Sequence, residues 1–239
     1  MKIFQVIIGT EILQGRRNDK HFDFLKNALL DRGYELFASF LIKDDPKLLK
    51  DVFYLIKETP DSYLFSYGGI GATPDDFTRE TAAEVFSGSK MKYNEEFKNL
   101  IDRKFPNEDN SKKYLLAYWP ENSEPIWNNP INGYPGFMIN KRYFFFPGFP
   151  QMAHPMTEWI LEKFFPKREK KEKHTLIAFA KESEMLDIMN KIPKEVEFST
   201  LPKLDYTSEI TFQGENSKKI YDWFKNELEK KNINYKEVK

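Results

Sequence analysis

Apolar side chains recur with two different spacings over the first 67 residues. Short apolar runs predict buried strands at residues 3–8, 34–42 and 63–67. Apolar residues three and four positions apart predict helices at residues 19–31 and 46–56. Gly33 follows the first helix and Pro46 opens the second, which is typical of helix ends and starts. Strands that alternate with helices favour an α/β fold, with a parallel sheet covered on both faces.

The order of predicted elements changes after the third strand. Helices are predicted at residues 81–86, 95–104 and 152–165. Between residues 114 and 149, recurring prolines separate short apolar segments. Two of these segments flank Asn140 and Lys141, so we expect a β-hairpin at that point.

A charged stretch, Lys167 to Lys173, lies between two patterned regions. Glutamates interrupt its basic residues, which favours a solvated linker over a nucleic-acid patch. Beyond it, the predicted order β-α-β-β-α-β is the split βαβ pattern of a small α+β module. We therefore divide the chain into an α/β domain at 1–166, a linker at 167–173 and an α+β domain at 174–239.

Composition excludes several classes of partner and site. The 239 residues include 37 basic and 37 acidic side chains, so no net charge draws the chain to nucleic acid or to an anionic membrane. The absence of cysteine excludes disulfides, cysteine-based zinc sites and a cysteine nucleophile. The first apolar run is too short for a signal peptide or a membrane span, so we expect a cytoplasmic location by default.

A glycine-rich segment joins the third strand to the next helix. Its glycines let the backbone approach a phosphate closely, and the helix start offers free N–H groups. These glycines are Gly68, Gly69 and Gly71. The adjacent Asp75 and Asp76 would repel a phosphate unless a divalent cation lay between, which indicates a metal–phosphate site. In the alternative reading, the two carboxylates only cap the helix.

Two further loops are expected beside this one. The segment Gly9–Gly15 follows the first strand, and Asp44 and Asp45 follow the second. Ligands in parallel α/β sheets bind beyond the carboxyl ends of the strands. We therefore expect the three loops to converge on one edge of the sheet.

Four motifs resemble those of the CinA-type competence/damage-inducible proteins, and they occur in the family's order. Residues 9–15 (GTEILQG) resemble GDELL-x-G, and residues 68–78 (GGIGATPDDFT) resemble GGLGPT-x-DD-x-T. Residues 129–137 resemble NP-x-G-x-APGF, and residues 147–150 (PGFP) resemble PGVP. The resemblance implies a molybdopterin-binding (MoaB/Mog-like) domain, a three-layer α/β fold, over residues 1 to about 166.

The resemblance implies two alternative functions for one site. One is hydrolysis of nucleotide pyrophosphates of the ADP-ribose or FAD type with a divalent metal (Mg, Mn or Co), and the other is non-catalytic binding of molybdopterin or a related phosphorylated pterin. Both need donors for phosphate oxygens, and hydrolysis also needs a carboxylate-held cation. The implied catalytic residues are Asp76 and Asp45, and the implied metal ligands are Asp44, Asp45, Asp75 and Asp76. The implied ligand-binding residues are Gly68, Gly69, Gly71, Thr73, Thr78, Glu11, Asp19, Arg17, His21 and Gly136.

The chain departs from the family pattern in ways that leave alternatives open. The family's DTN reads Asp19-Lys20-His21 here, preceded by Arg16-Arg17. These basic groups either contact phosphate or are exposed charges at a helix start that Asp19 caps. Met152 replaces a glutamate of the family, which weakens the case for hydrolysis but not for binding. Similarly, Thr73 and Thr78 either bind phosphate or fasten the loop.

The tail at residues 174–239 is similar in order of elements to the KH-like domain of CinA proteins. A KH domain that binds RNA needs a GXXG loop, but Gly214 is the sole glycine after residue 148. Residues 175–239 carry 11 basic and 12 acidic side chains, so we expect a structural or dimerisation role and no nucleic-acid binding. Family members often form homo-oligomers, although no surface of this sequence predicts an interface. The amidase domain of full-length CinA proteins has no counterpart here.

Overall fold

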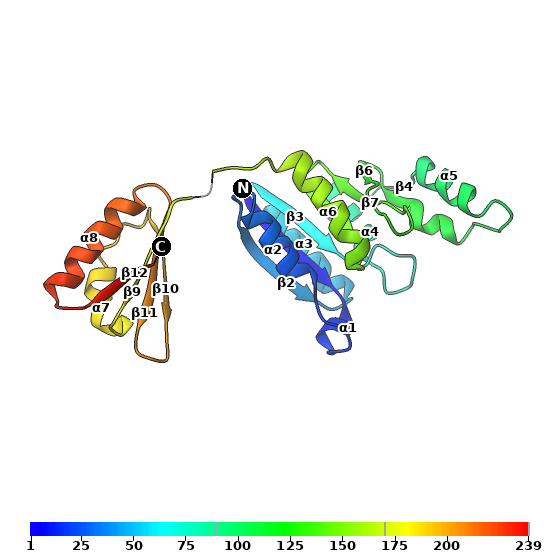
Figure 1. Cartoon of the computed structure of the whole chain (residues 1–239). Helices are drawn as coiled ribbons and strands as arrows, with labels where there is room; N and C mark the ends of the chain where they lie inside the picture. Colours follow the sequence, from blue (N-terminus) through cyan, green and yellow to red (C-terminus); the bar gives the residue numbers. More distant parts are fainter. Residues whose placement is uncertain (89, 170, 239) are drawn as a thin grey trace. The chain divides into compact units, whose positions relative to one another are not determined.

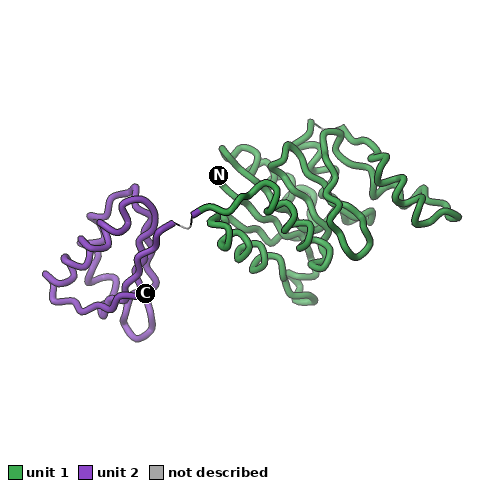
Figure 2. Tube along the Cα trace, turned by 45° about the horizontal axis from the view of Figure 1, so that its top comes forward, with its two compact units in different colours: residues 1–168 green, residues 169–239 purple. Residues whose placement is uncertain are grey.

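The computed structural model describes residues 1–88, 90–169 and 171–238. The chain folds into two compact units, Met1–Arg168 and Glu169–Lys239 (Figure 2). The first unit contains two hydrophobic clusters, one on each face of its sheet, and the second has a cluster of its own. Each unit therefore has the separate core that marks a domain.

The first unit is built on a six-stranded sheet with the order β2-β1-β3-β8-β7-β6. The strands are β1 (Lys2–Ile8), β2 (Leu36–Ile42), β3 (Ser62–Tyr67), β6 (Ser123–Ile126), β7 (Gly136–Ile139) and β8 (Tyr143–Phe146). The pairs among β1, β2, β3 and β8 are parallel, whereas β7 pairs antiparallel with both β8 and β6. The predicted α/β class with a mostly parallel sheet is confirmed, with antiparallel pairing added at one edge.

Helices cover both faces of this sheet, as the sequence predicts (Figure 1). On one face lie α3 (Pro46–Glu58), α4 (Thr78–Ala82) and the π-helical turn η1 (Ala83–Ser87). On the other lie α2 (His21–Leu30) and α6 (Pro150–Phe164), while the short α1 (Thr10–Leu13) follows β1. Helix and sheet thus form three layers. Among the helices of the described residues, none has the length and apolar character needed to traverse a bilayer.

An insertion between η1 and β6 extends the face that carries α3. It contains β4 (Met91–Tyr93), α5 (Glu95–Lys104), the 3₁₀ turn η2 (Lys113–Ala117) and β5 (Tyr118–Pro120). β4 and β5 pair antiparallel, and Phe97 and Ile101 of α5 are buried in the core of that face. The insertion is therefore packed onto the α/β unit by its apolar side chains.

The predicted hairpin between β7 and β8 is confirmed. The two strands pair antiparallel, with Ile139 opposite Tyr143. Asn140 and Lys141 have φ angles of 54° and 52°, the left-handed backbone that a tight hairpin turn needs at both central positions. Asparagine tolerates this conformation well, but lysine adopts it at a cost in free energy.

The second unit has the predicted element order. It contains β9 (Lys173–Ala178), α7 (Glu182–Met189), β10 (Glu197–Pro202), β11 (Ser208–Gln213), α8 (Ser217–Lys230) and β12 (Tyr235–Val238). The strands form an antiparallel sheet with the order β10-β11-β9-β12. Met185 of α7 and Phe224 of α8 pack with Leu176, Ile210 and Phe212 of the sheet. The α+β architecture follows from this packing, and the KH-like description stays a prediction.

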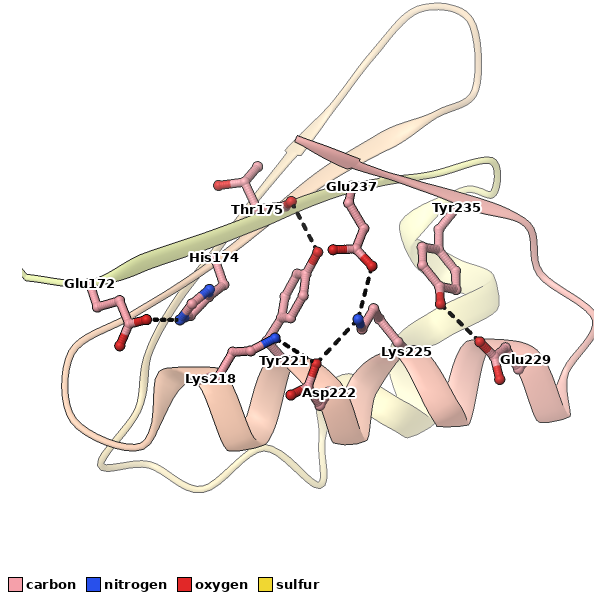
Figure 3. Close-up of polar contacts among 10 residues, drawn as sticks. All are labelled: Glu172, His174, Thr175, Lys218, Tyr221, Asp222, Lys225, Glu229, Tyr235 and Glu237. Carbon is pink, nitrogen blue, oxygen red and sulfur yellow. Dashed lines mark hydrogen bonds and ion pairs between the residues drawn. The ribbon is translucent and has the colours of Figure 1, made fainter. Parts of the chain in front are cut away.

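A polar network joins the last strand, β12, to helix α8 (Figure 3). Lys225 Nζ lies 2.9 Å from Glu237 Oε1 and 3.2 Å from Asp222 Oδ1. Hydrogen bonding from Lys225 holds the pKa of Glu237 below its usual value, and hydrogen bonding from Lys218 does the same for Asp222. On the same face, the Tyr235 hydroxyl donates to Glu229 (2.8 Å). These contacts hold a four-residue edge strand on the helix.

The strained hairpin turn leads to a first prediction. Lys141→Gly should raise the free energy of unfolding of the first unit by about 0.5–1 kcal/mol, because glycine adopts positive φ without the steric cost of lysine. Urea unfolding followed by tryptophan fluorescence measures this change. Asn140→Ala is the matched comparison and should lower stability, because alanine tolerates the left-handed region less well than asparagine. An unchanged or lower midpoint for Lys141→Gly would contradict the argument.

The network of the second unit leads to a prediction with a defined pH dependence. Folding lowers the pKa values of Glu237 and Asp222, so their contribution is present at neutral pH and is lost as pH falls through the folded values. Lys225→Met should therefore cause a small loss of thermal stability at neutral pH, small because exposed ion pairs contribute little. The difference from wild type should shrink as pH falls below about 4 and disappear once both carboxylates are protonated in the folded state. Lys219→Met, on the same helix but outside the network, is the control, and a loss that persists in acid would rule out the ion pairs as its cause.

Candidate functional site

The predicted glycine loop follows β3 and folds back on itself before α4. Gly68 and Gly69 have φ angles of 101° and 67°, and a side chain at Gly69 would overlap the Thr78 hydroxyl. That buried hydroxyl donates to the Gly68 carbonyl oxygen (3.0 Å), and the Thr78 N–H donates to the Gly69 carbonyl oxygen (3.0 Å). Thr78 therefore fastens the loop, which is one of the two roles predicted for it.

Four consecutive N–H groups of the loop remain available to a ligand. Within the described residues, no hydrogen bond engages the backbone N–H of Gly69, Ile70, Gly71 or Ala72. Successive backbone donors between a strand and a helix form the kind of nest that binds phosphate or carboxylate oxygens. Because α4 has only five residues, the N–H groups rather than a helix dipole give the loop this property.

Thr73, Asp75 and Asp76 form a hydrogen-bonded cluster at the tip of the loop. The Thr73 hydroxyl oxygen lies 2.5 Å from Asp75 Oδ1 and 2.5 Å from Asp76 Oδ2, and the Thr73 N–H donates to Asp76 Oδ2 (2.9 Å). Hydrogen bonding from Thr73 holds the pKa of Asp75 below its usual value. Neither carboxylate caps α4, whose start has no side-chain cap, so the capping alternative does not describe this pair. Two negative groups instead converge on one hydroxyl proton.

The loop borders a cavity of about 350 Å³ at the carboxyl edge of the sheet. Three parts of the chain line it: the glycine loop, the turn after β8 with the start of α6, and the insertion with the segment that follows β6. The lining residues are Gly69, Ile70, Gly71, Asp76, Phe97, Leu116, Asn129, Asn132, Tyr134, Pro135, Pro147, Gly148, Phe149 and Met152. Three of the four sequence motifs thus meet at one cavity with a largely apolar lining.

Asp44 and Asp45 lie outside this lining and have structural partners. Asp44 Oδ2 accepts hydrogen bonds from the N–H and the hydroxyl of Thr10 (2.8 Å each). Asp45 caps α3, and its Oδ1 accepts a hydrogen bond from the Leu48 N–H (2.7 Å). This placement gives no support to the predicted catalytic role of Asp45 or to the predicted metal roles of both residues.

Asp75 and Asp76 are the remaining predicted metal ligands, and they lie on the glycine loop. The described residues include no group of three or more His, Cys, Asp or Glu side chains arranged to hold a metal. Asp75 and Asp76 converge on one hydroxyl, so they fit a cation as two ligands. Phosphate oxygens of a bound ligand and water would complete the shell, which is the way Mg²⁺ is usually held in phosphate-binding sites.

Arg17 and Glu11 lie behind the turn that follows β8. Arg17 Nη2 donates to the Gly148 carbonyl oxygen (3.2 Å), and Arg17 Nη1 lies 3.8 Å from Glu11 Oε1. The guanidinium carbon of Arg17 lies 5.1 Å from the centre of the Phe149 ring. Arg17 therefore contacts the cavity wall from outside the cavity lining, and Glu11 lies beside Arg17.

His21 supports the same turn from within the fold, and Asp19 caps the helix that carries His21. His21 is 3% exposed, its ring stacks on Tyr67 (4.4 Å), and its Nε2 lies 3.2 Å from the Gly148 carbonyl oxygen. Since a carbonyl only accepts, His21 Nε2 is the donor in this contact, and burial lowers the pKa of the ring. Asp19 caps the start of α2 by accepting from the N–H groups of His21 (2.8 Å) and Phe22 (3.0 Å). Neither residue lines the cavity.

Gly136, a predicted ligand-binding residue, and Asn129, which lines the cavity, have structural roles. Gly136 is buried at the start of β7, where a side chain would overlap the Phe145 carbonyl oxygen. Asn129 lines the cavity, but its Nδ2 donates to Asn132 Oδ1 (2.7 Å) and to the Tyr134 carbonyl oxygen (2.8 Å). Its amide therefore shapes the segment between β6 and β7.

Sequence reasoning missed Arg79 and the wall that the insertion supplies. Arg79 follows Thr78 in α4, is 4% exposed and donates to the carbonyl oxygens of Leu115 and Tyr118. It therefore joins the helix after the glycine loop to the turn that carries Leu116. An arginine at a helix start gives no sequence signal of burial, and no local pattern indicates which distant segment will accept its hydrogen bonds.

Comparison with known proteins identifies the family to which this chain belongs. The family model described as "Probable molybdopterin binding domain" matches residues 5–167. A protein of Archaeoglobus fulgidus is 27% identical over 225 residues, which cover 92% of this chain and 93% of the relative. A CinA-like protein of Acaryochloris marina is 32% identical over 163 residues, which cover 64% of this chain and 38% of the relative. The chain thus matches less than half the length of that CinA-like protein.

A solved structure agrees with these matches. The crystal structure of the protein CinA with unknown function from Thermoplasma acidophilum has a TM-score of 0.60 and 27% identity to this chain. The match covers 68% of this chain and 96% of the chain in that crystal structure. The predicted resemblance to CinA-type proteins is confirmed, and the chain belongs to the family of molybdopterin-binding domains.

Proposed function

We propose that the cavity binds a small molecule that joins a flat heterocycle to a phosphate group, namely a phosphorylated pterin or a nucleotide. The observation that carries this proposal is that a loop with four consecutive N–H groups, none with an acceptor in the described structure, borders a cavity with an apolar and aromatic lining. The volume of about 350 Å³ is within the range of small-molecule sites. The family description supports a pterin as the heterocycle.

The walls of the cavity suit the heterocycle. Phe97 and Tyr134 come from the insertion side, and Phe149 and Met152 come from the start of α6. Aromatic rings and thioethers pack favourably against flat rings. A ligand ring in this cavity would therefore gain both burial and stacking.

The glycine loop suits the phosphate group. The N–H groups from Gly69 to Ala72 are donors without acceptors in the described structure. Asp75 and Asp76 would repel an unaccompanied phosphate, so a divalent cation is expected to enter with the ligand. Mg²⁺, Mn²⁺ and Co²⁺ are the candidates.

Binding is tested with a probe that carries both groups, 6-hydroxymethylpterin diphosphate, titrated calorimetrically with and without Mg²⁺. Gly71→Ala should weaken binding by about tenfold or more, equivalent to about 1.4 kcal/mol, because its methyl group would overlap the Asp76 carboxylate beside the N–H donors. Asn107→Ala, at an exposed position after α5 and outside the cavity lining, is the control and should bind as wild type does. No binding by the wild type, or equal binding by Gly71→Ala, would reject the assignment of the phosphate to this loop.

Hydrolysis of a nucleotide pyrophosphate is the second candidate function. The observation that favours it is the convergence of Asp75 and Asp76 on the Thr73 hydroxyl, next to the cavity. A bound divalent cation would neutralise charge that develops on the phosphoryl group. The loop N–H groups would hold and orient the phosphate oxygens, and Asp76, which lines the cavity, would accept a proton from the attacking water.

Hydrolysis is tested by incubating the protein with ADP-ribose or FAD and each of the three metals, and by following AMP by chromatography. Asp76→Asn should reduce AMP release by about 100-fold or more, the usual contribution of a general base. Asp45→Asn keeps a good helix cap and should retain activity, because Asp45 lies outside the cavity. Loss of AMP release in Asp45→Asn would show that Asp45 contributes to catalysis after all. If the wild type releases no AMP under any condition, hydrolysis of these substrates is rejected and the binding proposal still stands.

A further inference from the structure

Phe149 lines the cavity with an exposed aromatic ring, and hydrogen bonds hold its backbone in place. The residue is 56% exposed and lines the cavity together with Gly148 and Met152. Its carbonyl oxygen accepts from the N–H groups of Met152 (3.0 Å) and Ala153 (2.9 Å), and Pro150 restricts the backbone that follows. The main chain of Phe149 is therefore fixed while its ring stays accessible.

Arg17 lies over the ring of Phe149. The distance from its guanidinium carbon to the ring centre is 5.1 Å, within the range of a favourable cation–π contact. The same guanidinium is held by the Gly148 carbonyl oxygen (3.2 Å) and by Glu11 Oε1 (3.8 Å). A planar cation with two further partners covers one face of the ring and limits its rotation.

The other aromatic residues of the cavity are less accessible. Phe97 is 2% exposed and packs in the core, and Tyr134 is partly buried against the same core. Phe149 is therefore the aromatic ring of this lining that has most of its surface open to solvent. An exposed apolar ring held in one place gains free energy when a ligand covers it, and it loses little conformational entropy in doing so.

We propose that Phe149 is a stacking platform that selects ligands with a planar ring, and that Arg17 is its positioning residue. This inference rests on the proposed binding function and adds to it the group that recognises the heterocycle. Stacking on Phe149 does not require a phosphate, and phosphate binding at the glycine loop does not require Phe149. The two contributions can therefore be measured separately.

Three probes separate the contribution of the ring from that of the phosphates. 6-Hydroxymethylpterin diphosphate has both groups, 6-hydroxymethylpterin has the ring alone, and inorganic pyrophosphate has the phosphates alone. Each is titrated calorimetrically with Mg²⁺ into the full chain, and pterin fluorescence reports stacking by its quenching. Phe149→Leu should weaken both ring-bearing probes by about tenfold, the usual effect of losing one stacking partner, and should leave pyrophosphate unchanged. Phe149→Trp should restore binding and quenching. Phe22→Leu, an exposed phenylalanine of α2 outside the cavity lining, is the matched control.

The outcomes distinguish this inference from the function on which it rests. If the wild type binds the ring-bearing probes and Phe149→Leu binds them equally well, the platform is rejected and the binding function stands. If Phe149→Leu weakens all three probes alike, the residue acts on the shape of the site rather than on the ring, and the platform is again rejected. If the wild type binds no probe, both proposals fail.

Arg17 is tested by the same titrations. Arg17→Ala should weaken the ring-bearing probes by about threefold and reduce fluorescence quenching, because the ring of Phe149 becomes freer to rotate. Arg17→Lys keeps a cation over the ring and should recover part of both effects. In the Phe149→Leu background, Arg17→Ala should have little further effect on these probes. A full additional loss in that background would show that Arg17 contacts the ligand itself and would overturn its positioning role.

Discussion

The glycine loop is closed by one buried hydrogen bond, from the Thr78 hydroxyl to the Gly68 carbonyl oxygen. The bond is possible because Gly69 has no side chain at the place where Thr78 approaches. This bond uses a side-chain donor and a carbonyl acceptor, so it leaves the following N–H groups of the loop without acceptors in the described structure. The groups that close this segment and the groups proposed to bind the ligand are therefore different atoms, so loop closure and ligand binding do not compete for the same hydrogen bonds.

The cavity arises because a parallel arrangement and an antiparallel one meet at the same edge. Parallel pairing of β1, β3 and β8 brings the turns after these strands together. The antiparallel β7 and β6, with the insertion, add the opposite wall. Residues behind the turns, such as Asp44 and His21, use their polar groups to hold neighbouring backbone in place. On the cavity side, the loops thus present backbone donors and apolar side chains.

The helices and strands could be predicted from the sequence more completely than the residues that line the cavity. Short apolar runs and helix-boundary residues depend on local spacing, so they located β1, β2 and β3, the hairpin at Asn140, and the element order of the second unit. The glycine loop was found for the same reason. The predicted role of Asp45 stays a prediction, because a helix cap before a proline and a site carboxylate look alike in sequence and the structure shows Asp45 as the cap of α3. Phe97 and Arg79 were missed because their positions depend on long-range packing of the insertion, which leaves no local pattern.

The carbonyl oxygen of Gly148 accepts hydrogen bonds from both Arg17 and His21, and it belongs to a residue that lines the cavity. Any shift of that turn therefore changes the electronic environment of the buried imidazole, although His21 does not line the cavity itself. Only two other histidines are present in the chain, so the ring nitrogen resonances of His21 can be assigned readily in an NMR spectrum. The fold thus contains its own spectroscopic reporter, which can follow occupancy of the cavity without a label on the ligand.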